Sequence, residues 1–234
     1  MLTAPQFSPD ALQSVHDRID RAARQAGRDP AEICLLAVGK QHPASMLRAA
    51  YDAGQRDFGE NFAQEGAAKA DELADLADLR WHFIGHLQAN KTREVAERFA
   101  WVHTVDRERI AARLSAQRPH HAPPLQVLLQ VRLADEPAKG GIAPDAVASL
   151  ATVVASLPRL RLRGLMCLPP PAPTLDAQRA PFRELRTLLE RLNANGHQLD
   201  TLSMGMSDDL EAAVMEGATI VRVGTAIFGA RPRD

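Results

Sequence analysis

The chain has 234 residues, of which 45% are hydrophobic and 24% are charged, as in an ordinary soluble globular protein. This length allows one large domain or two small ones, and a core of that size needs neither a disulfide nor a metal. The formal net charge of -1 gives no electrostatic support for binding nucleic acid or an anionic membrane. The first 20 residues lack the apolar core of a signal peptide, and no stretch is as long as a membrane span, so we expect a cytoplasmic protein.

The chain opens with a helix signal and then alternates between strands and helices. Ser8 is expected to be the N-cap of a first helix and Pro9 its first residue, and Gly27 and Pro30 follow its end. Strands are expected over residues 33–38, 57–61, 81–85, 101–105, 125–131, 162–168, 201–205 and 219–224. Helices are expected between them over residues 44–53, about 62–77, 88–99, 107–117, 144–156, 176–195 and 208–216.

Eight strands that alternate with helices across short connections are typical of parallel βαβ units. The pattern predicts a single (β/α)8 TIM barrel over residues 1–234, with an extra N-terminal helix. The last strand has no full helix after it, so we expect the N-terminal helix to cover that gap. A doubly wound open sheet is the alternative, but no Gly-x-Gly-x-x-Gly motif follows the first strand.

Lys40 follows the first expected strand at a position that favours amine chemistry. The six apolar residues 33–38 predict a strand buried on both faces, and Pro43 suits the first turn of the next helix. Partial desolvation at the end of such a strand favours the neutral amine, which is the nucleophile toward carbonyl groups. The alternative is that Lys40 extends into solvent, as most lysines at strand ends do.

The C-terminal ends of the expected strands gather polar residues on one rim of the barrel, where barrel sites form. The residues at this rim are Lys40, Glu60, Asn61, Gly85, His86, Met166, Cys167, Ser207, Gly224 and Thr225. After the seventh and eighth strands, glycines allow backbone N–H groups to approach an anion, and Ser207 and Thr225 add hydroxyl donors. These two residues would alternatively cap helices. Together with Lys40, the loops predict one amine facing a phosphate site.

Two classes of ligand fit an amine that faces a phosphate site. One is pyridoxal 5'-phosphate (PLP), held as a Schiff base on Lys40. The other is a sugar phosphate in a Schiff-base aldolase or a related phosphosugar enzyme. A metal site is not expected, because a strand ends between His82 and His86 and they share no helix face. Cys34 and Cys167 are expected to be small buried hydrophobic residues.

Arg222 favours the first class of ligand. Alternation along the last strand places it on the same face as Ile220 and Gly224, inside the barrel. A buried arginine needs a partner, and the pyridine nitrogen of PLP is a suitable acceptor. The alternative is an ion pair between Arg222 and a carboxylate such as Glu60 or Asp209.

Several long motifs in this order resemble the pyridoxal phosphate homeostasis protein family. They are Ala37-Val38-x-Lys40, Phe58-Gly59-Glu60-Asn61, Trp81-His82-Phe83-Ile84-Gly85-x-Leu87-Gln88-x-Asn90-Lys91, Leu202-Ser203-Met204-Gly205-Met206-Ser207-x-Asp209 and Arg222-x-Gly224-Thr225-x-Ile227-Phe228-Gly229. The likeness runs from residue 33 to residue 229. It implies a single-domain barrel similar to the N-terminal domain of alanine racemase, and a role in buffering or delivering PLP in intracellular vitamin B6 homeostasis.

The resemblance also implies roles for particular residues. Lys40 carries PLP as a Schiff base, and Arg222 faces the pyridine nitrogen. The phosphate is held by Ser207, Gly224 and Thr225, and the residues near the cofactor are Asn61, His86 and Met204. One position departs from the family, because Gly39 stands before the lysine where the family often has Ser or Thr. The loss of a hydroxyl there is expected to loosen the lysine without removing the nucleophile.

We interpret the chain as a reversible PLP carrier that is not an enzyme and has no catalytic residues. Arginine stays charged and cannot accept a hydrogen bond from a protonated ring nitrogen, so the electron sink of the cofactor is weak. The chain is also expected to be without the second domain that supplies an acid or base in alanine racemase-like enzymes. The expected partners are PLP and apo forms of PLP-dependent enzymes, and the chain is expected to be a monomer. The alternatives are a PLP-dependent racemase, a Schiff-base phosphosugar enzyme and an interaction scaffold.

Overall fold

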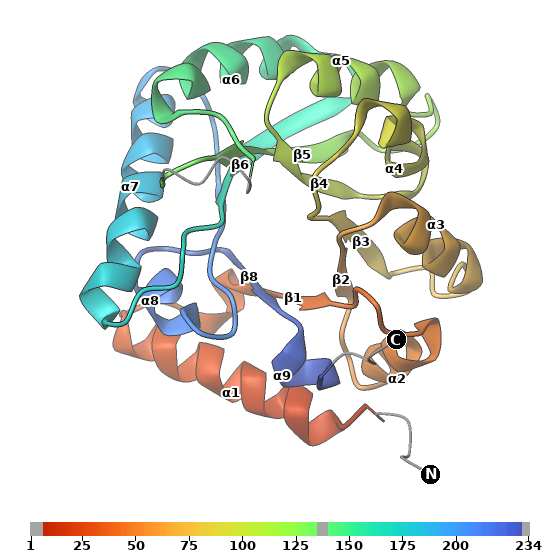
Figure 1. The fold of residues 1–234 in the computed structure, drawn as a ribbon, viewed down its shortest axis with the longest axis vertical. Coiled ribbons are helices and arrows are strands. Elements are labelled where there is room, and N and C mark those ends of the chain that lie inside the picture. Colours follow the sequence, from red (N-terminus) through yellow and green to blue (C-terminus); the bar gives the residue numbers. More distant parts are fainter. Residues whose placement is uncertain (1–6, 135–139, 231–234) are drawn as a thin grey trace.

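A computed structural model describes residues 7–134 and 140–230 of the chain. Eight parallel strands form a closed barrel in the order β1 to β8, and helices surround it (Figure 1). The strands are β1 (Cys34–Val38), β2 (Asp57–Glu60), β3 (Arg80–Phe83), β4 (Trp101–Val105), β5 (Leu125–Val131), β6 (Leu160–Cys167), β7 (Thr201–Ser203) and β8 (Ile220–Val223). β1 pairs with both β2 and β8, which closes the barrel and confirms the predicted fold.

The helices follow the expected alternation with the strands. They are α1 (Pro9–Gln25), α2 (Ala44–Asp52), α3 (Ala63–Glu72), α4 (Thr92–Arg98), α5 (Glu108–Gln117), α6 (Val147–Ser156), α7 (Leu175–Ala194), α8 (Leu210–Met215) and α9 (Thr225–Phe228). Short 3₁₀ turns, Ala89–Lys91 and Pro144–Ala146, precede α4 and α6, within ranges where helices were expected. No helix in the described ranges is both long and apolar enough to cross a membrane.

The largest difference from the expected boundaries is at α3, which ends at Glu72 and not near residue 77, and smaller differences lie around β7 and after β8. β7 ends at Ser203 because Gly205 adopts a positive φ of 92°, which turns the chain out of the strand. α8 begins at Leu210, since the Asp209 carboxylate accepts a hydrogen bond from the Met206 N–H and closes a turn before the helix. The short helix α9 after β8 was not expected.

The N-terminal helix α1 covers the gap beside the last strand, as predicted. Pro9 is its first residue and Ser8 its N-cap, although the Ser8 side chain makes no capping hydrogen bond. α1 packs against α8 and α9 (Figure 1). Arg18 fixes this contact by bonding to Glu211 at 3.0 Å and to the Ser207 carbonyl at 2.9 Å.

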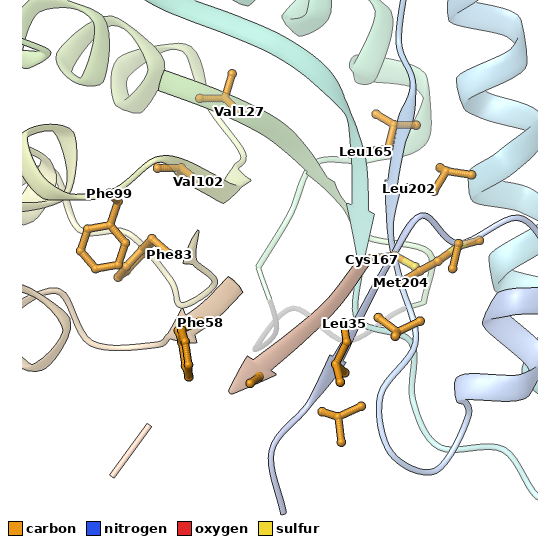
Figure 2. Packing of buried hydrophobic residues seen from close by; sticks show 14 of the residues in the cluster. Leu35, Phe58, Phe83, Phe99, Val102, Val127, Leu165, Cys167, Leu202 and Met204 are labelled. Atoms are coloured by element: carbon orange, nitrogen blue, oxygen red, sulfur yellow. The ribbon is translucent and has the colours of Figure 1, made fainter. Parts of the chain in front are cut away.

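The hydrophobic core forms two layers, because alternate strand residues face the helices or the barrel interior. The outer cluster lies between strands and helices and includes Phe83 and Phe99, whose rings meet edge to face at 5.7 Å (Figure 2). The inner cluster is small and is formed by Leu36, Val38, Ile84 and Ile220. Polar side chains occupy part of the remaining interior, and some of them reach the cavity described below.

Candidate functional site

A cavity of about 560 Å³ opens at the C-terminal ends of the strands. Six of the eight residues that the sequence proposed for the site line it, namely Lys40, Asn61, Ser207, Arg222, Gly224 and Thr225. They come from the ends of β1, β2 and β8 and from the loop after β7. Parallel strands bring these ends to one rim, so residues far apart in the sequence meet around one space.

The two other proposed residues do not line this cavity. His86 is exposed, and Met204 is fully buried in the outer hydrophobic cluster. The sequence analysis missed several lining residues, which are Val38, His42, Ile84, Leu168, Pro169, Met206 and Asp208. Most are apolar or lie in loops, so residue type alone gave little reason to select them.

The chain makes a tight turn at Lys40, and side chains from α3 form hydrogen bonds with the backbone of this turn. Gln41 adopts a positive φ of 62°, which is uncommon for a residue other than glycine. Its N–H donates a hydrogen bond to Glu65 Oε1 at 2.6 Å. On the other side of Lys40, the Gly39 carbonyl accepts a hydrogen bond from Lys69 Nζ at 2.8 Å. The backbone on both sides of Lys40 is therefore fixed by α3.

Lys69 is the centre of a buried ionic cluster beneath this turn. Its amine lies 2.7 Å from Glu60 Oε1 and 2.7 Å from Glu65 Oε1. Burial raises the pKa of Glu60 to about 7, although the charges of Lys69 and Lys40 act in the opposite direction. The second oxygen of Glu60, Oε2, is buried and has no hydrogen-bond partner in the described part of the chain. The sequence analysis missed Lys69, because a lysine within an amphipathic helix normally faces solvent.

Gly39 fits closely against this cluster. A Cβ at Gly39 would lie 3.0 Å from Glu60 Oε1 and 3.0 Å from a methyl group of Leu47. A Ser or Thr at this position would therefore require Glu60 or Leu47 to move. Gly39, which departs from the family pattern, therefore fits the narrow space between Glu60 and Leu47.

Arg222 extends from β8 into the barrel and is 4% exposed. Its Nη1 donates to Ser203 Oγ at 2.8 Å, and its Nη2 donates to the Cys167 carbonyl at 2.9 Å. Burial lowers the pKa of Arg222, but a guanidinium keeps its charge in proteins. The alternative ion pairs are not formed, because Glu60 bonds to Lys69 and Asp209 bonds to a backbone N–H. Arg222 thus presents a buried positive charge at the cavity wall.

The part of the rim that follows β8 suits an anion. Gly224 is the N-cap of α9 and Thr225 its first residue, and the leading N–H groups of a helix have no partner within the helix. A Cβ at Gly224 would lie 3.2 Å from the Val38 carbonyl oxygen, so a larger residue would crowd β1. Ser207 adds a hydroxyl from the loop after β7. Backbone and hydroxyl donors therefore converge at one end of the cavity.

Asn61 offers an unused polar group at the cavity wall. Its Oδ1 atom is buried and has no hydrogen-bond partner among the residues that the structure describes. The backbone at Asn61 is held in place by Gly85, since a Cβ at Gly85 would lie 1.9 Å from the Asn61 carbonyl oxygen. A buried acceptor without a partner is costly, so this atom fits a site that a polar ligand completes.

The described part of the chain offers little support for metal or thiol chemistry. Residues 7–134 and 140–230 contain no cluster of three or more His, Cys, Asp or Glu side chains that could hold a metal ion. Cys34 and Cys167 are free thiols. Burial raises the pKa of the Cys167 thiol to about 12, and it also raises the pKa of Cys34. Both thiols therefore stay protonated and unreactive near neutral pH.

Comparison with known proteins agrees with this geometry. The family model described as the N-terminal domain of alanine racemase matches residues 11–232. The pyridoxal phosphate homeostasis protein of Pseudomonas aeruginosa is 58% identical over 220 residues, which cover 94% of this chain and 94% of that protein. The protein of the same name from Escherichia coli K12 is 52% identical over 222 residues, which cover 94% of this chain and 95% of that protein.

Solved structures show the same relationship. PipY of Synechococcus elongatus PCC7942, whose structure was determined with PLP bound, is 41% identical with a TM-score of 0.80, covering 90% of this chain and 99% of that chain. Alanine racemase of Corynebacterium glutamicum is 16% identical with a TM-score of 0.66 and shares only the fold, covering 98% of this chain and 64% of that chain. Because the two homeostasis proteins are each more than half identical over nearly their whole length, this chain belongs to the pyridoxal phosphate homeostasis protein family.

Proposed function

We propose that this chain binds PLP covalently through Lys40 and buffers or delivers it in intracellular vitamin B6 homeostasis. The observation that carries the proposal is the convergence of Lys40, Arg222 and the Gly224–Thr225 turn on one cavity. The homeostasis proteins of the family and the PLP-bound structure of PipY support the same assignment.

The residues present fit PLP group by group. The phosphate would be held by Ser207, Gly224 and Thr225, through hydroxyls and the leading N–H groups of α9. The ring nitrogen would be held by Arg222, whose guanidinium is already fixed by two hydrogen bonds. Asn61 Oδ1 would accept a hydrogen bond that no group in residues 7–134 and 140–230 supplies.

PLP, when bound, supplies an aldehyde that bonds to a primary amine and can be exchanged to another amine. The protein positions that amine, because Lys69 and Glu65 fix the backbone before and after Lys40. Arg222 places a permanent positive charge at the ring nitrogen, which disfavours protonation there. PLP catalysis depends on electron withdrawal into the ring, so this arrangement favours a carrier over an enzyme.

The alternative is an active PLP-dependent racemase or a Schiff-base phosphosugar enzyme. The names of the related homeostasis proteins describe PLP homeostasis and no reaction. An assay across free D- and L-amino acids separates the two possibilities. Turnover at ordinary enzyme rates that disappears in Lys40→Ala would contradict the carrier function.

The proposal is tested by titrating the protein with PLP and recording its absorption spectrum. The wild-type chain should develop the chromophore of amine-bound PLP, and Lys40→Ala should lose it at equimolar PLP. Lys91→Ala, which removes a lysine outside the cavity, is the matched control and should behave as wild type. A wild-type spectrum in Lys40→Ala would refute the assignment of the amine.

Delivery is tested separately with an apo form of a PLP-dependent enzyme. The loaded protein should restore the activity of that enzyme, whereas protein reduced with borohydride should not. We further expect the protein to be a monomer. We also expect it in the reducing cytoplasm, because its two cysteines are free thiols. Restored activity with reduced protein would contradict reversible delivery through the amine.

A further inference from the structure

A continuous chain of hydrogen-bonded side chains crosses the interior of the barrel. Arg222 Nη1 lies 2.8 Å from Ser203 Oγ, and Ser203 Oγ lies 2.9 Å from His103 Nδ1. His103 Nε2 lies 3.0 Å from His82 Nδ1, and His82 Nε2 lies 3.0 Å from Asp57 Oδ1. All five side chains are buried. The residues come from β8, β7, β4, β3 and β2, so the chain links strands on different sides of the barrel.

The two ends of this chain reach two different cavities. Arg222 lines the cavity that contains Lys40. Asp57 lines a second cavity of about 490 Å³, together with Arg80 and Trp101. These three are the first residues of β2, β3 and β4, whereas the Lys40 cavity lies at the C-terminal strand ends. Because the strands are parallel, the chain of hydrogen-bonded side chains runs from one end of the barrel toward the other.

The chemistry of the two ends fixes the direction of every hydrogen bond. A guanidinium only donates, so Ser203 Oγ accepts from Arg222. An ionised carboxylate only accepts, so His82 donates its Nε2–H to Asp57. His82 Nδ1, when the ring is neutral, then accepts from His103 Nε2–H, and His103 Nδ1 accepts the hydroxyl proton of Ser203. Both imidazoles are therefore Nε2–H tautomers, and each donor has an acceptor.

The protonation states agree with this direction. Burial lowers the pKa of His103 well below its usual value, with further lowering by His82 and Arg222. Burial also lowers the pKa of His82, although Asp57 acts in the opposite direction. Burial alone would raise the pKa of Asp57, but hydrogen bonds from His82 and Arg80 bring it to about 2. Two neutral histidines thus connect a cation at one end with an anion at the other.

The surrounding groups hold the chain in this arrangement. Trp101 stacks on the His82 ring with a centroid distance of 5.4 Å and an interplanar angle of 4°. Arg80 bonds to both carboxylate oxygens of Asp57 at 2.7 and 2.6 Å. Within the described ranges Arg222 donates to a hydroxyl and a carbonyl and to no carboxylate, so its charge depends on polarised neighbours for stabilisation inside the barrel.

We propose that Ser203, His103, His82 and Asp57 form a positioning relay that fixes the orientation of the Arg222 guanidinium toward the ring nitrogen of the cofactor. This inference rests on the proposed PLP function and deepens it. It predicts that a substitution outside the Lys40 cavity changes the environment of the bound cofactor. A change at Asp57, which does not line the Lys40 cavity, alters the environment of the ring nitrogen through the chain.

The direction of the relay is tested first in the cofactor-free protein. Nitrogen-15 NMR of the imidazole side chains should show His82 and His103 as neutral Nε2–H tautomers. Ser203→Ala removes the hydroxyl that donates to His103 Nδ1, and it should shift the nitrogen-15 resonance of His103 Nδ1. A protonated ring, or an Nδ1–H tautomer at either histidine, would overturn the inference whether or not PLP binds.

The effect on the cofactor is tested with PLP labelled with nitrogen-15 in its ring. Ser203→Ala should shift the ring resonance and weaken PLP binding about tenfold, which is the scale of one lost hydrogen bond to a charged group. Asp57→Asn should shift the same resonance while leaving the lining of the Lys40 cavity intact. Thr201→Val is the matched control, because Thr201 lies on the same strand as Ser203 and the substitution removes a partly buried hydrogen bond to Asp200 that is outside the chain of hydrogen-bonded side chains.

The outcomes separate the relay from a purely structural role and from the proposed function. A structural role predicts lower melting temperatures with an unchanged ring resonance, and this result would overturn the relay. Failure of wild-type protein to attach PLP at Lys40 would refute the proposed function instead, while the imidazole spectra still decide the direction of the chain. If Ser203→Ala does not fold, Asp57→Asn and the wild-type imidazole spectra carry the test.

Discussion

Replacing Lys69 by methionine removes the cation that the buried Glu60 carboxylate depends on. Glu60 is fully buried and Lys69 is 6% exposed, and their polar atoms lie 2.7 Å apart. Breaking a buried ion pair by removing one partner costs about 3–5 kcal/mol. Glu60 has a pKa of about 7, so it can take up a proton near neutral pH and avoid part of this cost. We therefore expect a loss near the lower end, about 3 kcal/mol.

The same substitution also removes a support of the Lys40 turn. Lys69 Nζ donates to the Gly39 carbonyl, and methionine cannot replace that bond. PLP binding should therefore weaken together with stability. The expected loss of about 3 kcal/mol corresponds to a fall in melting temperature of roughly 6–12 °C for a chain of this size.

Urea denaturation of wild type, Lys69→Met and Lys69→Met/Glu60→Gln measures this effect. The double variant should recover most of the loss, because the fully buried carboxylate is gone and Glu65, which also loses its ion pair, is 27% exposed and keeps the hydrogen bond from the Gln41 N–H. Arg48→Met is the matched control, since it breaks an ion pair of the same 2.7 Å length on the surface, where such pairs contribute little. Equal stability changes in Lys69→Met and Arg48→Met would refute the reasoning.

Three further predictions address the anion end of the cavity, the buried carboxylate and the cavity wall. Thr225→Val should weaken PLP binding about tenfold but leave binding of pyridoxal, which has no phosphate, unchanged; equal losses for both ligands would argue against phosphate contact. The folded-state pKa of Glu60, about 7, lies above its ordinary value of 4.5. Between these two pH values the folded chain therefore binds more protons than the unfolded chain. The free energy of unfolding should fall by about 3 kcal/mol as the pH rises from 4.5 to 7. Glu60→Gln should flatten this part of the stability–pH profile, and an unchanged slope would exclude Glu60 as its origin. Gly85→Ala should destabilise the fold by more than the ~1–3 kcal/mol of ordinary overpacking and so lower the melting temperature, because its Cβ would lie 1.9 Å from the Asn61 carbonyl oxygen; a wild-type melting temperature would contradict that contact.

The sequence was informative wherever the signal was local. Apolar runs and turn residues identified all eight strands, and the rule that barrel sites lie at strand ends brought Lys40, Ser207 and Thr225 to one rim. Boundaries were less certain where a glycine with positive φ or a side-chain hydrogen bond ended an element, as at Gly205 and Asp209. Such endings depend on geometry that residue type does not determine.

The features that the sequence did not predict depend on contacts between distant residues. Lys69 lies in the middle of α3, and only the packing of that helix on β2 shows that its amine reaches Glu60. The contact between His82 and His103 was not predicted, because the two residues lie on different strands. Alternation along β3 and β4, combined with a barrel, would have placed both inside, and this signal was available in the sequence.

The account depends most directly on a covalent bond between PLP and one of the four lysines of the chain. Wild-type protein loaded with equimolar PLP, reduced with borohydride and digested, should carry the phosphopyridoxyl group on the peptide that contains Lys40. Peptide mass spectrometry reads the position without any substitution in the protein. A label on another lysine at equimolar loading, or no label at all, would contradict the account.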